Sequence, residues 1–269
     1  MTSGTAGLKA TAVSRSESDP DPAARWSRNA LEAQRFAGRL AAPLWLPVVV
    51  LLMRFVLRWR IRDAGRCRKE YAKLLEAHRP LLVVANHLTM VDSAVIGWGL
   101  GSAIGHVVRH RGLPWNVPLQ RRVESSWLWR VLAYVMKCVP VPRGGDRQEV
   151  AHVLERLAHL LRSGETVLMF PEGGRSRSGR VDPEATADGV GRLIKDVDGC
   201  RVLCVYLRGD AQRTWSNLPA RGDTFTIATR LVEPRTALRG LRASRDLATQ
   251  VVHHLVEMER EFVEGRPAS

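Results

Sequence analysis

The chain has 269 residues, 45% of them hydrophobic and 25% charged, which is enough for one large domain or two small ones with a sizeable core. This composition excludes a wholly disordered protein and a collagen-like or coiled-coil rod, and the lack of any run of about 18 uncharged apolar residues excludes a polytopic membrane protein. The 41 Lys and Arg outnumber the 27 Asp and Glu, and the net charge of +14 favours an acidic partner such as an anionic bilayer, nucleic acid or a phosphorylated molecule. An arginine-rich genome composition is the alternative explanation of that charge.

The N-terminal 70 residues divide into two segments. Residues 1–25 are rich in Ser, Thr, Ala, Asp and Pro and have no hydrophobic periodicity, which predicts a disordered tail. Residues 26–70 contain an apolar run at 40–53 that includes two prolines and has arginines on both sides. A run of about 14 residues is too short to span a bilayer. The pattern therefore predicts a membrane-associated helical segment that lies in the interface, with Trp45 and Trp59 at the headgroup level; a buried amphipathic core helix is the alternative.

Short apolar strands alternate with helical stretches over residues 71–265, which predicts a single α/β domain with a largely parallel sheet flanked by helices. The predicted strands are residues 81–85, 104–109, 166–170, 202–207 and 224–231. The predicted helices are residues 92–100, 127–139, 146–163 and 244–263, the last with Ser244 as its N-cap.

The four cysteines show neither the spacing of a metal site nor a disulfide framework. They are Cys67, Cys138, Cys200 and Cys204. The sequence therefore predicts no metal and a reducing, cytosolic environment.

The strand at 81–85 is followed directly by Asn86 and His87, with Asp92 five residues after the histidine. This spacing lets the carboxylate turn toward the imidazole and hold it in one tautomer. His87 would then be a general base acting on a substrate hydroxyl, because no serine or cysteine nucleophile elbow accompanies it. Capping of the following helix is the alternative role for Asp92.

The strand at 166–170 is followed by a second polar loop, which contains Glu172, Gly173, Gly174, Arg175 and Ser176. The glycines permit unusual backbone conformations, and Arg175 offers a bidentate fork for phosphate. Ser176 adds a hydroxyl donor, and Glu172 would fix Arg175 or receive a substrate hydroxyl. A solvated basic loop is the alternative.

Together the two loops resemble the glycerolipid acyltransferase family. The first motif of that family, Asn-His-x-x-x-x-Asp, matches Asn86, His87 and Asp92, and its third motif, Phe-Pro-Glu-Gly-x-Arg-Ser, matches residues 170–176. Arg143 stands where the second motif ends in an arginine. The resemblance covers residues 45–235.

The resemblance implies an O-acyltransferase of phospholipid biosynthesis that moves a fatty acyl group from acyl carrier protein or coenzyme A to a lysophospholipid, with 1-acyl-glycerol-3-phosphate as the first candidate. It implies no cofactor besides the acyl thioester, which is a co-substrate. His87 and Asp92 would be catalytic. The implied substrate-binding residues are Asn86, Arg143, Glu172, Gly173, Gly174, Arg175 and Ser176.

The chain departs from the family pattern on the substrate side. Val141 and Pro142 replace the usual Phe-Ile-Asp before Arg143, and Cys204 and Tyr206 stand where the family tends to carry prolines. The acceptor therefore stays open between a lysophospholipid and another amphiphilic hydroxyl, as in a lyso-ornithine lipid, a glycolipid or a natural product. A non-catalytic basic module that binds membranes or nucleic acid is a remote alternative, against which the intact His/Asp pair argues.

We expect three partners from this pattern: an anionic membrane surface, an acyl carrier protein or coenzyme A thioester, and a lyso-lipid acceptor. We do not expect nucleic acid. The predicted location is the cytoplasmic face of the cell membrane, bound peripherally or monotopically.

Overall fold

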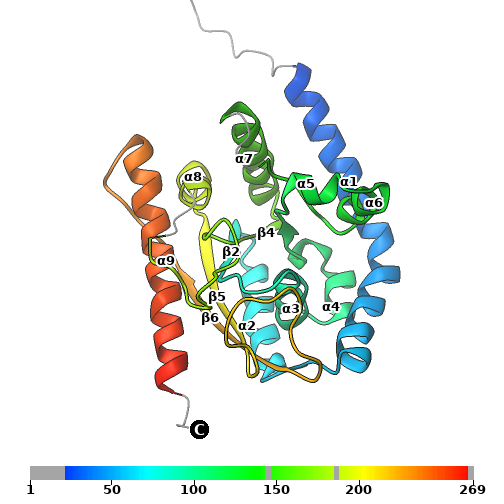
Figure 1. Cartoon of the computed structure of the whole chain (residues 1–269). Coiled ribbons are helices and arrows are strands. Elements are labelled where there is room, and N and C mark those ends of the chain that lie inside the picture. The colour runs from blue at the N-terminus through cyan, green and yellow to red at the C-terminus, as the bar shows by residue number, and fades with distance from the viewer. Residues whose placement is uncertain (1–21, 143–146, 185–187, 266–269) are drawn as a thin grey trace, which may run out of the picture.

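The computed structural model describes residues 22–142, 147–184 and 188–265 (Figure 1), so residues 1–21 of the predicted tail lie outside the described residues. The helices are α1 (Pro22–Leu51), α2 (Ala64–Glu76), α3 (Asp92–Leu100), α4 (Ala103–Val108), α5 (Gln120–Val123), α6 (Trp127–Val135), α7 (Arg147–Arg162), α8 (Asp188–Asp196) and α9 (Gly240–Glu264), with a π-helical turn η1 (Leu52–Val56) and a 3-10 turn η2 (His110–Gly112). The strands are β1 (Arg60–Ile61), β2 (Leu81–Ala85), β3 (Trp115–Asn116), β4 (Thr166–Met169), β5 (Arg201–Gly209) and β6 (Thr224–Val232).

The strands form one sheet in the order β1-β6-β5-β2-β4-β3. Strands β5, β2, β4 and β3 run parallel to one another, and β1 runs parallel to β6, whereas β5 and β6 form an antiparallel pair. The parallel neighbours are joined by connections that contain helices, and the antiparallel pair is joined by the loop 210–223. The prediction of an α/β domain with a largely parallel sheet is confirmed.

Strand β2 is buried along its whole length because helices cover both faces of the sheet. Leu82 and Val84 lie in a core shared with α7, α8 and α9, whereas Leu81 and Val83 lie in the core on the other face, shared with α2 and α3. A strand with apolar neighbours on both faces needs a continuous apolar run instead of an alternating one, which is what residues 81–85 show.

The predicted strand at 104–109 is wrong, because this segment forms helix α4. Ser102 caps the helix, since its Oγ accepts a hydrogen bond from the backbone N–H of Gly105 (3.0 Å). The segment packs against α1 and pairs with no strand of the sheet. A short apolar run is ambiguous between strand and helix, and here the cap and the tertiary partner decide.

The predicted N-cap of the last helix is also wrong. Helix α9 begins at Gly240 after Arg239, and Ser244 is buried inside it. Ser244 faces α8 so closely that a Cβ added to Gly191 would lie 1.7 Å from the Ser244 carbonyl oxygen. Only a glycine permits this approach of the two helices. The predicted helix at 127–139 ends early, at Val135, because Lys137 adopts a left-handed conformation with φ 56°.

Helix α1 begins at Pro22, inside the predicted tail, and continues through Pro43 and Pro47 without interruption. One face of α1 and η1 packs on the domain and includes the buried residues Leu31, Ala42, Leu46 and Met53. The opposite face is apolar and exposed, with residues recurring every three or four positions. They are Phe36, Leu40, Leu44, Val48, Leu52 and Phe55. Over residues 28–56 the helix is long and apolar enough to cross a membrane, by length and composition alone.

Polar contacts fix α1 to the domain. The Gln34 amide donates to the carbonyl oxygens of Tyr134 (3.1 Å) and Cys138 (2.9 Å), at the end of α6. Arg35 forms an ion pair with the buried Glu165 (3.0 Å), which also pairs with the fully buried Lys137 (2.6 Å). Because Gln34 and Glu165 are buried, these contacts hold the middle of α1 against the domain.

Trp59 does not lie at a surface, contrary to the prediction. It is buried, packs edge-to-face on Phe225 and donates its indole N–H to the carbonyl oxygen of Ala220 (2.9 Å). Trp45 is half-buried and packs against the cluster that α1 and α4 share. A tryptophan near an apolar run fits a protein core as well as a headgroup region, and the sequence does not distinguish them.

Candidate active site

The two polar loops of the sequence lie side by side at one edge of the sheet. Strands β2 and β4 are parallel neighbours, with Val84 opposite Met169, so the loops that follow them leave the sheet at the same edge. A backbone hydrogen bond from Ser176 to the carbonyl oxygen of His87 (2.9 Å) joins the loops directly. In open α/β sheets this carboxyl edge is where ligands bind.

His87 and Asp92 form the pair that their spacing predicts. The His87 Nδ1 lies 2.9 Å from the Asp92 Oδ2, and the His87 side chain is 20% exposed whereas Asp92 is buried. Because a carboxylate can only accept, the contact favours the proton on Nδ1 and leaves the Nε2 lone pair free to take a proton.

Asp92 is itself held by the loop that it closes. Its Oδ2 accepts hydrogen bonds from the backbone N–H groups of Leu88 (2.6 Å) and Thr89 (2.7 Å), and its Oδ1 accepts from the Thr89 hydroxyl. These donors satisfy the buried carboxylate oxygens and fix their position. Asp92 is the first residue of α3, whose N-cap position is Val91, so the carboxylate organises the loop before the helix.

Phe170 and Glu172 complete the surroundings of the imidazole. The Phe170 ring stacks on the His87 ring with centroids 4.1 Å apart and an interplanar angle of 18°. Glu172 Oε1 accepts a hydrogen bond from the backbone N–H of His87 (3.4 Å). The pKa of Glu172 is raised to about 7, chiefly by burial and also by the nearby carboxylates of Asp182, Glu259 and Asp92, although the His87 hydrogen bond lowers it.

Asn86 is buried and binds strand β5. Its amide nitrogen donates to the Leu207 carbonyl oxygen (3.0 Å), and its side-chain oxygen accepts from the Leu207 N–H (2.7 Å). Both polar groups of Asn86 thus continue the backbone pairing of β2 with β5 beyond the end of β2. In this structure Asn86 fixes where His87 leaves the sheet.

Arg175 is held by the β5–β6 loop, residues 210–223. Its Nη1 donates to the carbonyl oxygen of Ser216 (3.1 Å) and to Asn217 Oδ1 (2.8 Å), and its guanidinium lies 4.9 Å from the centre of the Trp215 ring. Within the described part of the chain, Nε and Nη2 of Arg175 have no partner and remain available as a fork for an anion. No ion pair joins Arg175 to Glu172 among the described residues.

Distant segments also hold the rest of the loop after β4. The Arg208 guanidinium donates to the carbonyl oxygens of Gly179 and Arg213, and Glu259 of α9 accepts from the backbone N–H of Val181 (3.0 Å). A Cβ added to Gly179 would lie 2.5 Å from the Arg213 carbonyl oxygen, and its φ is 72°, so this position needs glycine for both space and conformation.

The remaining predicted site residues are placed as follows. Gly173 has φ 61° and its N–H donates to the Phe170 carbonyl oxygen (3.2 Å), and Gly174 follows it half-buried. The Ser176 hydroxyl bonds to Ser178 (3.0 Å) and to the Arg180 carbonyl oxygen, so it is engaged within the loop. Arg143 lies outside the described residues.

Sequence reasoning missed the residues that support the site. Thr89, Trp215 and Asn217 carried no signal of their own, because nothing in the local pattern shows that residues 215–217 meet residues 88–90. The structure joins these segments by backbone hydrogen bonds between Ser216 and Leu88 (3.1 Å) and between Met90 and Asn217 (3.2 Å). Only the antiparallel return of β6 beside β5 brings the connecting loop over the site.

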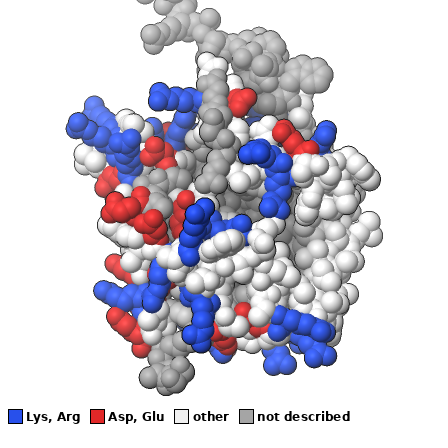
Figure 2. Space-filling model, in the orientation of Figure 1, with Lys and Arg blue, Asp and Glu red and all other residues white. Residues whose placement is uncertain are grey.

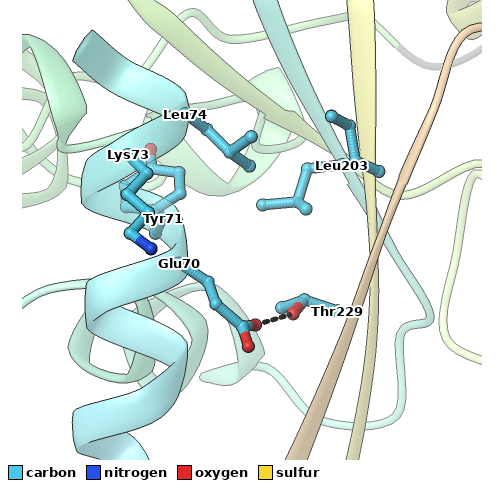
Figure 3. Close-up of a pocket in the computed structure, with 7 residues that line it drawn as sticks. Glu70, Tyr71, Lys73, Leu74, Leu203 and Thr229 are labelled. Atoms are coloured by element: carbon cyan, nitrogen blue, oxygen red, sulfur yellow. Dashed lines mark hydrogen bonds between the residues drawn. The ribbon is translucent and has the colours of Figure 1, made fainter.

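A cavity of about 250 Å³ lies elsewhere, between α2 and the sheet (Figure 3). Its lining includes Tyr71, Leu74 and Leu203, and at its mouth the Thr229 hydroxyl donates to Glu70 (3.2 Å). It shares no residue with the two loops. The described residues contain no group of three or more His, Cys, Asp or Glu side chains placed to hold a metal ion, and the four cysteines are free thiols.

A histidine–aspartate pair and an arginine loop at the carboxyl ends of adjacent parallel strands define the chain as an α/β protein with an enzyme-like site. Residues 66–231, more than half of the chain, match the sequence model of the Acyltransferase family. The chain therefore belongs to the glycerolipid acyltransferase family, as the motifs predict. A comparison with curated proteins finds no match.

Proposed function

We propose that this acyltransferase moves a fatty acyl group from an acyl carrier protein or coenzyme A thioester to the hydroxyl of a lysophospholipid, with 1-acyl-glycerol-3-phosphate as the first candidate. The observation that carries the proposal is the His87–Asp92 contact of 2.9 Å, which leaves the imidazole Nε2 free on a partly exposed ring. A free imidazole nitrogen beside a carboxylate suits deprotonation of an alcohol.

In this mechanism His87 Nε2 takes the proton of the acceptor hydroxyl as the hydroxyl oxygen attacks the thioester carbonyl carbon. Asp92 stabilises the imidazolium that forms, and the loop donors around Asp92 hold its carboxylate in place. The tetrahedral intermediate collapses by breaking its carbon–sulfur bond, and the imidazolium returns the proton to the leaving thiolate. The products are an ester and a free thiol.

The loop after β4 would supply hydrogen-bond donors for two negative charges, the oxyanion of the tetrahedral intermediate and the phosphate of the acceptor. The Gly173 N–H is used within the loop, so the backbone N–H groups of Gly174 and Arg175, which have no partner among the described residues, are the candidates for the oxyanion. The free Nε and Nη2 of Arg175 form the candidate site for the acceptor phosphate. Arg143 is a second candidate by its place in the motif.

We further propose that the protein lies on the cytoplasmic face of the cell membrane and is bound monotopically. The exposed apolar face of α1 and its flanking arginines support membrane contact. Its other face is fixed to the domain by Gln34, Ala42 and Leu46, among others, which favours a helix that lies along the bilayer surface over one that crosses it.

The test is release of free thiol from acyl-coenzyme A and from acyl carrier protein, measured against a panel of lyso-lipids with the wild type and His87→Ala. We expect acceptor-dependent release by the wild type only. Release with lyso-ornithine lipid or a glycolipid but not with lysophosphatidic acid would reassign the acceptor. No release with any acceptor would refute acyl transfer.

A further inference from the structure

Helix α6 carries an unusual number of exposed apolar side chains for a helix in a folded domain. They are Trp127, Leu128, Trp129, Val131 and Tyr134. Trp127 is 72% exposed, and only Ala133 of the helix is buried. Large exposed apolar patches on a folded chain mark interaction sites, because solvation of so much apolar surface is unfavourable.

This surface is continuous with the exposed stripe of α1. Gln34 of α1 bonds to the backbone at the end of α6, and a Cβ added to Gly38 would lie 3.2 Å from the Val135 carbonyl oxygen, so the two helices are in close contact. Helix α4 packs against α1 as well and exposes Ile104 and Val108. We call the exposed apolar side chains of α1, η1, α4 and α6 the three-helix face.

The segments that carry the three-helix face have a net positive charge. Residues 28–60 contain six arginines and one glutamate, and residues 103–135 contain five arginines and one glutamate. Helix α9, on the other side of the molecule, has three arginines against five acidic residues. In Figure 2 the side that carries α1, α4 and α6 is largely uncharged, with Lys and Arg at its lower border, whereas the opposite side carries acidic and basic residues together.

We infer that α6 and α4 insert into the membrane surface together with α1, so that the protein binds an anionic bilayer through the whole three-helix face. Tryptophan and tyrosine beside aliphatic residues, with arginines at the border, match the interface between acyl chains and anionic headgroups. A second copy of the chain fits poorly, because a symmetric contact would bring the arginines of both copies together. This inference extends the membrane association within the proposed function and does not depend on the identity of the acceptor.

The experiment compares two matched double variants of the full chain. Leu128→Glu with Val131→Glu changes two exposed residues of α6, and Leu238→Glu with Leu241→Glu adds the same charges at exposed positions next to and on α9. Co-sedimentation with vesicles of phosphatidylcholine and phosphatidylglycerol measures binding. We expect the α6 variant to bind at least about tenfold more weakly than the wild type, since each carboxylate replaces a membrane-inserted apolar group, and the control to bind normally.

A second measurement reports insertion itself. Brominated lipids quench tryptophan in contact with acyl chains, and we expect Trp127→Phe with Trp129→Phe to lose part of that quenching while still binding the vesicles. Equal binding by both Glu variants, or unchanged quenching, would overturn the inference. Concentration-dependent dimers of the wild type that the α6 variant abolishes would overturn it too, in favour of a second copy.

Thiol release with short-chain, water-soluble substrates separates this inference from the proposed function. We expect the α6 variant to keep wild-type turnover there, because α6 contributes no residue to the two loops. If the variants bind vesicles as predicted but the wild type shows no turnover, the acyltransferase proposal is refuted and the inference that the three-helix face binds membranes still stands.

Discussion

The two loops of the site are stabilised in different ways. In the loop after β2, Asp92 takes its three donor residues, His87, Leu88 and Thr89, from within five residues of itself. In the loop after β4, Arg175 depends on the loop 210–223. The side chain of the proposed base is thus oriented by its own turn, whereas the proposed anion-binding side chain is oriented by a loop that lies more than 30 residues further along the chain.

The largest effect is expected in the local loop. His87→Ala removes the proposed base, and because general-base catalysis contributes about 10²–10⁴-fold, kcat should fall at least that far. The variant loses the contacts of the ring with Asp92 and Phe170, but Asp92 keeps its donors from Leu88 and Thr89, so the protein should still fold with a cooperative thermal unfolding curve. Retention of more than about a tenth of wild-type turnover would show that the base lies elsewhere.

Asp92→Asn tests how far the local loop depends on its carboxylate. The imidazole remains, so the loss of kcat should be severe but smaller than in His87→Ala. The buried carboxylate accepts from several donors at once, and hydrogen bonds to a charged group are worth about 1.5–3 kcal/mol each, so the variant should also unfold more readily in urea. An unchanged urea midpoint would contradict the assignment of Asp92 as the organiser of the loop.

Arg175→Ala tests the loop that is held from outside. Loss of a charged hydrogen bond should lower kcat/KM about 10- to 150-fold for a phosphorylated acceptor, mainly through the acceptor KM, with little effect for an unphosphorylated one. Arg175→Lys should keep more of the wild-type kcat/KM than Arg175→Ala but not all of it, because an ammonium group keeps the positive charge and lacks the two-pronged geometry of the guanidinium. Equal losses for both acceptors would move the phosphate site to another cation, with Arg121, Arg122 and Arg143 as candidates.

Glu172→Gln tests the contact between the two loops through pH. The pKa of Glu172 is raised from 4.5 to about 7 by burial, so between these values the folded state keeps a proton that the unfolded state has released. Stability should therefore fall as the pH rises from 4.5 to 7, and Glu172→Gln should lose that dependence. Urea unfolding should show that at pH 8 the free energy of unfolding of the variant exceeds that of the wild type by about 1–3 kcal/mol, and that this difference is smaller at pH 5. The same pH slope in both proteins would place the raised pKa elsewhere.

Trp215→Leu is the mildest change. A cation–π contact at an exposed site is worth about 0.5–1 kcal/mol, so the acceptor KM should rise about two- to fivefold with kcat nearly unchanged. Leu218→Ala, an exposed change in the same loop, is the control and should leave both constants as they are. A fall in kcat without a change in KM would show that the 210–223 loop supports the base and not the arginine.

The sequence alone determined the buried strands at 81–85 and 166–170, the polar loops after them and the His87–Asp92 pair. The loops and the residue pair depend on neighbours a few residues away, and the strands show the continuous apolar runs typical of strands that are buried on both faces. Tertiary structure decided the rest. Whether 104–109 is a strand or a helix depended on α1, the burial of Trp59 depended on Phe225, and the partners of Arg175 depended on the return of β6. Such contacts join residues that are far apart in the chain, and the local sequence of one segment does not specify which distant segment will pack against it.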